Sequence, residues 1–241
     1  MTTAEQPSPV LVDEPDDIHW EVPYIFHSLG VAMPEEERAA HLAEVSAEIW
    51  SGGTAYQRDT VAQWYGEIAA DAAEDGAVYC GLSLMGTEDD RITTATLVIL
   101  AEEADTSDPE VAAAALVELL SLDPAHEVIR TEVSCGPAVL VLSGMVLDLS
   151  SQTDDAGPAT LELAQAEVYI PVPGTGTLVV MRISTPSLPE FPDYVTMLAT
   201  TADSVRYRRP GAPEPEGGAG AGEAAAGVTL PQQTRITEAF G

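Results

Sequence analysis

The side chains with the greatest chemical potential in this sequence are its histidines and cysteines. The four histidines are scattered along the chain, at His19, His27, His41 and His126. A zinc site favours two imidazoles on one face of a helix or strand, and no HxxxH or HxH pair provides them. Cys80 and Cys135 each precede a glycine in an apolar, strand-like run. A catalytic thiol needs an accessible position and an activating base, so we predict reduced, buried cysteines and no metal site.

Two glycine-containing segments share single features with catalytic loops. Gly174 and Gly176 have neither the strand-to-helix setting nor the lysine of a phosphate-binding loop. Ser143-Gly144 lies in an apolar run without the flanking glycine of a nucleophile elbow. We interpret the first pair as a turn and the second as a bulge or a close packing contact. The sequence predicts no catalytic residue and no cofactor.

Acidic residues gather in four short segments, at 13–17, 35–37, 88–90 and 154–155. Calcium needs about six to eight oxygen ligands at defined loop positions, and none of these segments has the EF-hand spacing. We interpret them as solvated loops and as acids in the first turn of a helix. On the more polar face of the sheet we expect a buried ion pair of Arg130 or Arg182 with Glu132, Glu162 or Glu167, which is either structural or part of a ligand site.

The chain is strongly acidic. Forty acidic residues stand against nine basic ones, all of them arginine, which gives a formal net charge of −31. A protein that binds nucleic acid or anionic lipid needs a basic patch to neutralise phosphates, so the composition argues against both partner classes. The charges balance from Val205 onward, so the excess acid belongs to residues 1–204. These acidic residues either keep the protein soluble or form a surface that docks onto a basic partner.

The sequence predicts a cytoplasmic protein. Residues 1–15 are polar and contain prolines, without the basic start and apolar run of a signal peptide. The longest apolar stretches, 111–122 and 137–147, are shorter than the roughly 20 residues that a membrane helix requires. We therefore expect no membrane insertion. The low cysteine content also fits a reducing compartment.

Two amphipathic helices are predicted in the N-terminal third. Pro34 and the acids after it suit the first turn of a helix that ends near Trp50, and Thr54 can cap a second helix that ends near Asp75. Apolar residues at helical spacing give the second helix one stripe, formed by Val61, Trp64, Tyr65, Ile68 and Ala72. A Ser-Gly-Gly segment separates the helices, so we expect an αα-hairpin.

The apolar pattern then changes from helical spacing to alternation. Strands are predicted at 18–26, 77–85, 92–101, 127–135, 138–149, 160–171 and 177–185, and helices at 108–122 and from about 186. Pro23 places the first strand at an edge or breaks it. The run 138–149 is apolar on both faces, so it should lie centrally. Short connections between the last four strands favour a meander.

This order of elements predicts an α+β fold. We expect a mostly antiparallel, six- to seven-stranded sheet with helices packed on its faces, and a disordered C-terminal tail. Three segments follow: a flexible N-terminus over 1–15, a single α+β sandwich domain over 16–205, and a flexible Pro/Gly/Ala-rich tail over 206–241. The tail ends in spaced apolar residues, which form either a docking motif or an inert extension.

The last third of the chain carries a resemblance. The run YIPVPGTGTLVVMRISTP, from Tyr169 to Pro186, precedes a helix with Tyr194, Met197 and Leu198. It resembles the closing hairpin and helix of PsbP-like α/β/α sandwich domains and is similar to actinobacterial LpqN-like lipoproteins. The resemblance implies a helix packed across an antiparallel sheet, and a protein-binding or scaffolding role in a secretion or envelope system without a shared catalytic set. The signal and lipidation cysteine of those lipoproteins are not found near the start of this sequence.

Aromatic residues give the one indication of a recognition surface. They concentrate in the N-terminal third and either fill the core or contact a partner. With the end of the tail, the candidate partner-binding residues are Trp20, Tyr24, Trp50, Tyr56, Ile236 and Phe240. We predict a non-catalytic, acidic protein-binding or adaptor protein with an unidentified protein partner. The alternative is a small-molecule-binding protein or an unrecognised enzyme with a pocket between sheet and helices. The sequence specifies no oligomeric state.

Overall fold

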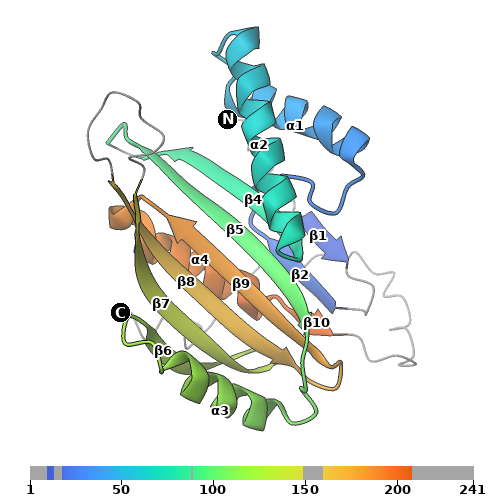
Figure 1. Ribbon diagram of the computed structural model, residues 1–241, viewed down its shortest axis with the longest axis vertical. Helices are drawn as coiled ribbons and strands as arrows, with labels where there is room; N and C mark the ends of the chain where they lie inside the picture. Colours follow the sequence, from blue (N-terminus) through green and yellow to red (C-terminus); the bar gives the residue numbers. More distant parts are fainter. Residues whose placement is uncertain (1–9, 14–17, 88, 149–159, 208–241) are drawn as a thin grey trace, which may run out of the picture.

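The computed structural model of the chain describes residues 10–13, 18–87, 89–148 and 160–207. Figure 1 shows the elements coloured along the chain. In chain order they are β1 (Val10–Asp13), β2 (Ile18–Val22), β3 (His27–Ser28), α1 (Glu35–Ile49), α2 (Ala55–Glu74), β4 (Ala77–Gly86), β5 (Ile92–Glu103), α3 (Pro109–Leu120), β6 (Glu127–Val133), β7 (Gly136–Asp148), β8 (Thr160–Val172), β9 (Thr177–Thr185), a short 3-10 helix (Leu188–Glu190), α4 (Phe191–Asp203) and β10 (Arg206–Tyr207). None of these helices is both long and apolar enough to cross a membrane.

Seven strands form one antiparallel sheet, in the order β3-β4-β5-β9-β8-β7-β6. The four strands after α3 form the predicted meander. The hairpin of β4 and β5 joins this meander through β5, where Leu97 pairs with Ile183 of β9. The α+β class and the antiparallel sheet of six to seven strands are therefore confirmed.

A second sheet contains three strands, in the order β1-β2-β10. Pro23 divides the strand predicted over 18–26, because β2 ends at Val22 and the chain turns before β3 begins in the large sheet. The structure also differs from expectation at both ends of the domain. Val10–Asp13 and Arg206–Tyr207, expected in flexible segments, both pair with β2. The rest of the predicted tail, including its expected disorder, lies outside the described residues.

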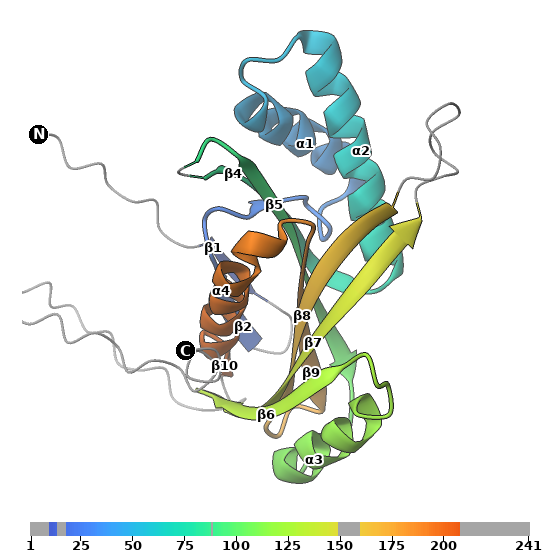
Figure 2. The same ribbon diagram turned by 90° about the vertical axis from the view of Figure 1, so that its left-hand side faces the viewer.

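Helix α4 and the small sheet cover one face of the large sheet (Figure 2). Their inward side chains and those of the central strands form the main core. Its largest members are almost completely buried and include Trp20, Leu97, Met181, Tyr194 and Leu198. Burial of each large apolar side chain contributes about 1.5–3 kcal/mol, so this layer is the main source of stability.

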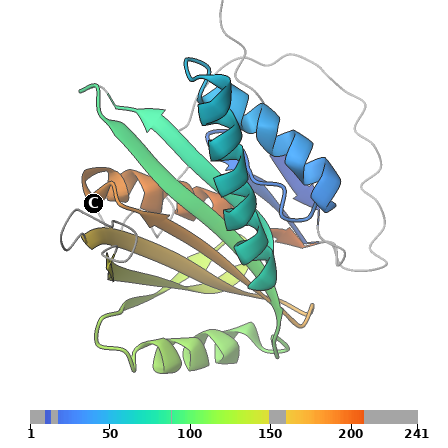
Figure 3. The same cartoon turned by 45° about the horizontal axis from the view of Figure 1, so that its top comes forward.

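Helices α1, α2 and α3 lie on the opposite face, as Figures 1 and 3 show. Leu42 of α1 and Val61 of α2 belong to one apolar cluster with Cys80 of β4. Ala113 of α3 packs with Val139 and Val141 of β7. The prediction that helices cover both faces is confirmed.

The predicted αα-hairpin is present, and its second helix begins at the predicted cap. Thr54 Oγ1 accepts a hydrogen bond from the Gln57 N–H at 3.3 Å, and Gln57 Oε1 accepts one from the Thr54 N–H at 2.9 Å. This reciprocal arrangement satisfies two N–H groups that a helix start otherwise leaves without partners.

The central position predicted for the apolar run 138–149 is wrong, because β7 lies next to the edge strand β6. The first half of β7 is covered on both faces: Leu140 lies in the main core, and Val141 lies under α3. In the second half, Met145 and Val146 are exposed. A strand that is apolar on both faces needs cover on both faces, and α3 supplies it close to the edge.

Candidate functional site

The structure separates the aromatic residues that the sequence placed together as binding candidates. Tyr24, Trp50 and Tyr56 are exposed, by 55%, 40% and 80% of their surfaces. Trp20 is only 1% exposed and lies in the main core, so it is not available to a partner. The alternation of β2 explains this, because Ile18, Trp20 and Val22 all point into the core. Ile236 and Phe240 lie outside the described residues.

The helical hairpin carries an exposed apolar surface, which we call the hairpin patch and define as Trp50, Tyr56, Trp64 and Ile68. The last three lie along α2 at intervals of eight and four residues. Trp64 is 57% exposed, although the sequence placed it in the buried stripe of its helix. Trp50 follows the end of α1, and its indole Nε1 donates a hydrogen bond to Tyr65 Oη at 3.2 Å. This bond fixes the Trp50 ring beside α2.

The position of α1 explains why Trp64 and Ile68 are exposed. Gly66 of α2 faces α1 so closely that a Cβ there would lie 3.7 Å from Leu42 Cδ1. Each residue advances a helix by about 100°, which places Trp64 and Ile68 on the flank of α2 away from that contact. A helix that packs against one neighbour and one sheet leaves the other flank open. The hairpin patch is therefore exposed because α1 and the sheet cover only the other sides of α2.

The hairpin patch lies within a strongly acidic part of the molecule. Residues 35–75 contain ten carboxylates and two arginines, Arg38 and Arg58. Arg58 Nη1 donates to the Gly53 carbonyl at 3.1 Å, so this guanidinium is engaged in closing the loop between the helices. The negative field around the patch favours a basic partner and disfavours an acidic one.

Strand β8 of the large sheet carries a polar network centred on Glu167. Its carboxylate is buried, forms an ion pair with Arg182, and accepts hydrogen bonds from Tyr169 Oη at 2.6 Å and Gln165 Nε2 at 2.9 Å. Burial, followed by the bond to Glu167, raises the pKa of Tyr169. Of the candidate pairs, that of Arg182 with Glu167 is present, whereas Arg130 forms its ion pair with Glu110 of α3. Because both carboxylate oxygens have partners, this network stabilises the sheet and offers no free acceptor.

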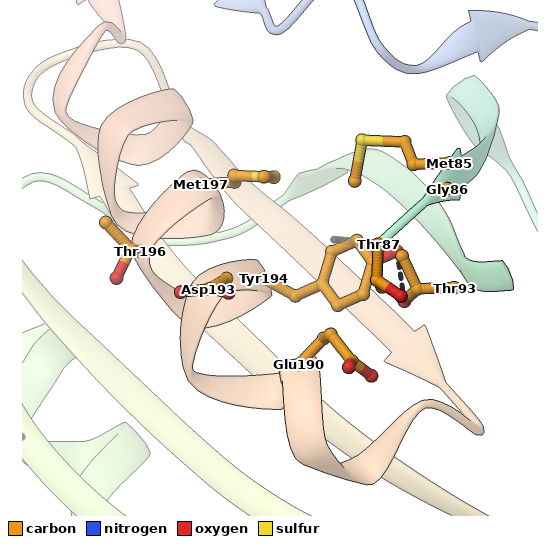
Figure 4. A pocket seen from close by; sticks show the side chains of 9 residues that line it. All are labelled: Met85, Gly86, Thr87, Thr93, Glu190, Asp193, Tyr194, Thr196 and Met197. Carbon is orange, nitrogen blue, oxygen red and sulfur yellow. Dashed lines mark hydrogen bonds between the residues drawn. The ribbon is translucent and has the colours of Figure 1, made fainter. Parts of the chain in front are cut away.

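A pocket of about 580 Å³ lies between the first turns of α4 and the end of the β4–β5 hairpin (Figure 4). We call it the α4 pocket. Its lining includes Met85, Thr93, Glu190, Asp193, Tyr194 and Met197. Thr93 Oγ1 and Tyr194 Oη share a hydrogen bond of 3.0 Å, which fixes the tyrosine ring inside the pocket. None of its lining residues was predicted as a site residue, because they come from segments about 100 positions apart.

Glu190, which lines the α4 pocket, forms an ion pair with Arg91, and Arg91 also pairs with Asp89. Arg91 Nη2 lies 2.5 Å from Glu190 Oε1, and Arg91 Nε lies 2.7 Å from Asp89 Oδ2. These contacts raise the pKa of Arg91 and lower that of Asp89. The other Glu190 oxygen, Oε2, is buried without a hydrogen-bond partner among the described residues. Asp193 adds a further negative charge at the pocket lining.

The two cysteines differ in burial: Cys80 is buried as predicted, whereas Cys135 is only half-buried, so the prediction of two buried cysteines is wrong for Cys135. Cys80 is buried under the helical hairpin, and Cys135 lines a shallow pocket with Ser134 and Arg206. Burial raises the pKa of each thiol to about 11. At neutral pH both sulfur atoms are therefore protonated and poor nucleophiles.

The raised thiol pKa values predict a measurable pH dependence. We expect the 240 nm absorbance of thiolate to rise near pH 11 in the native protein and near pH 9 in urea. Because the unfolded chain loses these protons first, the thiols contribute stability below about pH 9, and that contribution is lost as the pH rises toward 11. A Cys80→Ala/Cys135→Ala variant provides the blank. A native transition near pH 9 would contradict the raised pKa values of the two thiols.

The histidines with described contacts bond to nearby groups. His41 Nε2 lies 2.7 Å from the Ser28 carbonyl oxygen, and His126 Nδ1 lies 3.2 Å from that of Leu120. His27 lies 3.9 Å from Glu48. Within the described ranges, no three histidine, cysteine or carboxylate side chains gather as metal ligands would.

Comparison of the sequence with protein-family models finds no matching family, and comparison with curated proteins finds no matching relative. The resemblance of the C-terminal third to PsbP-like and LpqN-like domains therefore stays a prediction.

Proposed function

We propose that this protein is a non-catalytic adaptor that binds a protein partner through the hairpin patch. The observation that carries the proposal is the exposure of Tyr56 and Trp64 on one helix, at 80% and 57%. Tryptophan and tyrosine are the residues most enriched at binding hot spots, where each can contribute about 2 kcal/mol or more. Single exposed apolar residues are normal on soluble proteins, whereas a contiguous exposed apolar patch marks an interaction site. The exposed aromatic residues here lie together on one helix and the loop before it.

The acidic surroundings indicate the chemistry of the partner. We infer an apolar groove with a rim of lysine or arginine, because the ten carboxylates of residues 35–75 repel an acidic protein. Charged rims mainly raise the association rate and are screened by salt. Binding should therefore weaken above moderate salt.

The cell-biological setting and the tail complete the proposal. An association with a secretion or envelope system is supported by the resemblance of the C-terminal third alone. A docking motif near Ile236 and Phe240 is supported by the spaced apolar residues of the sequence. The cytoplasmic location is supported by the composition and the two cysteines. The alternative of an enzyme gains no support from Cys135, because its pKa is raised and its pocket lining contains no histidine among the described residues.

Affinity purification with mass spectrometry tests the proposal. The full-length protein is compared at low salt with a Tyr56→Ala/Trp64→Ala variant and with a control, Val111→Ala/Leu119→Ala, which removes two exposed apolar side chains from α3. We expect recovery of a stoichiometric partner to fall by about 30-fold or more in the patch variant only, in line with a loss of at least 2 kcal/mol. A chain that ends at Tyr207 tests the tail separately.

Two results would contradict this function. Equal recovery by the patch variant and the native protein would exclude the hairpin patch as the binding surface. If no specific partner is recovered at low salt by any version, the adaptor function itself is excluded. Circular dichroism and a urea midpoint for each variant confirm that the fold is retained, as expected for exposed helix positions changed to alanine.

A further inference from the structure

The hairpin patch follows one continuous row of side chains along α2. Tyr56, Trp64 and Ile68 are exposed, and Thr60 occupies the position midway between Tyr56 and Trp64, so the four residues recur at intervals of four. The Thr60 hydroxyl is engaged within the helix, where it donates to the Tyr56 carbonyl at 2.9 Å. At a rise of 1.5 Å per residue, the row is about 18 Å long. Rows of this spacing form the ridges by which α-helices pack on one another.

The shape of this ridge indicates a helical segment of the partner. Two helices interlock when the i±4 ridge of one lies in the groove between such ridges of the other, most often at about −50°. Amphipathic helices dock in this way through apolar residues spaced three and four positions apart. An extended peptide would instead pair with the edge of a sheet, which α2 does not offer. The apolar groove inferred for the partner is then a groove along one of its helices.

Two carboxylates lie on the same flank of α2 as this ridge. Glu67 follows Trp64 by three residues, so the two side chains are neighbours on the helix surface. Asp71 follows Glu67 by four and lies on nearly the same line of the helix as Trp64. Both carboxylates are exposed, and like charges at this spacing destabilise a helix. The exposed ring of Trp64 therefore borders a pair of repelling negative charges.

The arginines of the hairpin do not compensate these two charges. Within the described ranges, neither Glu67 nor Asp71 forms an ion pair. Arg58 donates to the Gly53 carbonyl in the loop between the helices. Arg38 lines the groove between α1 and α2 together with Glu67, without coming within ion-pair distance of it. A partner that brings its own cation to this flank gains an attraction that the free protein lacks.

Arginine fits this position better than lysine does. A guanidinium is planar, stacks on the face of an aromatic ring and carries five N–H donors. Tryptophan is the side chain whose ring attracts a cation most strongly. An arginine that stacks on Trp64 can therefore donate to the neighbouring Glu67 within the field of Asp71. Lysine supplies a point charge without a plane for stacking.

We propose that the hairpin patch binds an amphipathic α-helix of the partner, with an arginine stacked on Trp64 and paired with Glu67. The apolar face of that helix packs on the ridge from Tyr56 to Ile68. This inference rests on the proposed function, because it names the element of the partner that occupies the same patch. A second copy of this chain, with its formal net charge of −31, would bring further negative charge, so the partner is a different and basic protein.

Indole N–H signals provide the readout in the full-length protein. The chain contains three tryptophans, of which Trp50 and Trp64 belong to the hairpin patch and Trp20 is buried as an internal reference. The protein is labelled with 15N-tryptophan and titrated at constant ionic strength with a peptide of about 18 residues, or five helical turns. The peptide carries leucines on one helical face and arginines beside them. Three matched peptides replace arginine with lysine, replace arginine with glutamate, or place one proline at the centre of the arginine peptide.

We expect a saturable shift of the Trp64 signal with the arginine peptide, while the Trp20 signal stays in place. The lysine peptide should bind about threefold or more weakly, and the proline and glutamate peptides about tenfold or more weakly. A Kd for the lysine or the proline peptide equal to that for the arginine peptide would overturn the proposal. No Trp64 shift at about 1 mM arginine peptide would also overturn it. Equal shifts of all three indoles would do the same, because they indicate general attraction to an acidic protein.

Variants test the contact with the carboxylates. Glu67→Gln/Asp71→Asn keeps the apolar ridge and removes both charges, and we expect it to raise the Kd of the arginine peptide by about tenfold or more. The control Glu118→Gln/Glu127→Gln, at exposed positions of α3 and β6, changes the net charge equally. It should leave the Kd within about twofold, because distant surface charges are screened. An unchanged Kd in the Glu67→Gln/Asp71→Asn variant would exclude the arginine contact.

A chain that ends at Tyr207 tests whether the tail is the occupant. A Trp64 signal that differs between this chain and the full-length protein, in the absence of peptide, would assign the patch to the tail and overturn the proposal. We expect the two signals to coincide.

The same variants distinguish failure of this inference from failure of the proposed function. In the affinity purification, the Glu67→Gln/Asp71→Asn variant is compared with Tyr56→Ala/Trp64→Ala. Loss of the partner from both variants is the expected result. Loss only from Tyr56→Ala/Trp64→Ala would exclude the arginine contact and leave the adaptor function standing. Full recovery by both variants would exclude the hairpin patch, and with it both proposals.

Discussion

Replacement of Trp20 by alanine is expected to lower the free energy of unfolding by about 3–5 kcal/mol. Trp20 is the largest of the almost fully buried side chains, and it fills the space where β2 meets α4. Its cluster includes Val195 and Leu198 of α4, so the truncation leaves a cavity between the small sheet and the helix. Against a typical domain stability of about 5–15 kcal/mol, this is a large fraction.

Urea unfolding followed by circular dichroism measures the effect of the Trp20 change. Tyr24→Ala is the control, because Tyr24 is 55% exposed and its loss should change stability by no more than about 0.5 kcal/mol. Trp20→Phe adds a second test. The indole Nε1 is buried without a partner among the described residues, so phenylalanine removes an unsatisfied donor together with part of the ring. We expect a loss of about 1–2 kcal/mol. A loss as large as that of Trp20→Ala would contradict this account of the indole.

Replacement of Gly81 by alanine is expected to destabilise the protein by about 1–3 kcal/mol, although it adds only one methyl group. The Tyr79 ring lies across the backbone of Gly81, two residues later on the same face of β4. A Cβ at Gly81 would lie 2.5 Å from Tyr79 Oη and 2.9 Å from two ring carbons. Tyr79 is buried and donates a hydrogen bond to the Phe26 carbonyl at 3.2 Å, so its ring cannot move aside without loss of this bond.

The matched control for Gly81 is Gly52→Ala, in the loop between α1 and α2. A Cβ at Gly52 meets no atom within 4 Å, so we expect a change within about 0.5 kcal/mol. Chemical denaturation of both variants gives the comparison. Equal stability of the two variants would show that the Tyr79 ring has another position available in the core.

The elements of this fold could be predicted from the sequence because their signals are local. Thr54 and Gln57 form a cap within one turn, and the alternation of 77–85 and 92–101 identifies two strands joined by a short loop. Such signals depend on residues a few positions apart, and the predicted boundaries lie close to those of the structure. The antiparallel meander also follows from short connections alone.

The arrangement of the elements could not be predicted in the same way. The pairing of β5 with β9 joins residues about 80 positions apart, and no local pattern specifies it. The small sheet depends on Arg206–Tyr207 meeting β2, from the opposite end of the domain. Both pairings are decided by which apolar faces can be buried together, which is a property of the whole chain.

The candidate sites show the same limit. Trp50 and Tyr56 were predicted as binding candidates, yet the helical spacing of Trp64 indicated burial, and only the position of α1 explains its exposure. Alternation in β2 was the available sign that Trp20 points into the core. The α4 pocket requires that Glu190 and Met85 meet, which becomes evident only when β9 and its following helix are placed.

Strand β2 pairs with β10 and packs against α4, two elements that follow it by more than 160 positions. During synthesis on the ribosome, the main core therefore cannot form until both have emerged. The Glu21 N–H donates to Ser204 Oγ at 2.8 Å, across 183 positions of sequence. Strand β2 is translated before α4, and its apolar side chains lack the cover of that helix until α4 has emerged. The helical hairpin can form from local contacts during that interval, whereas the main core must wait for nearly the whole domain. Until then, the nascent chain carries Ile18, Trp20 and Val22 uncovered, within reach of chaperones.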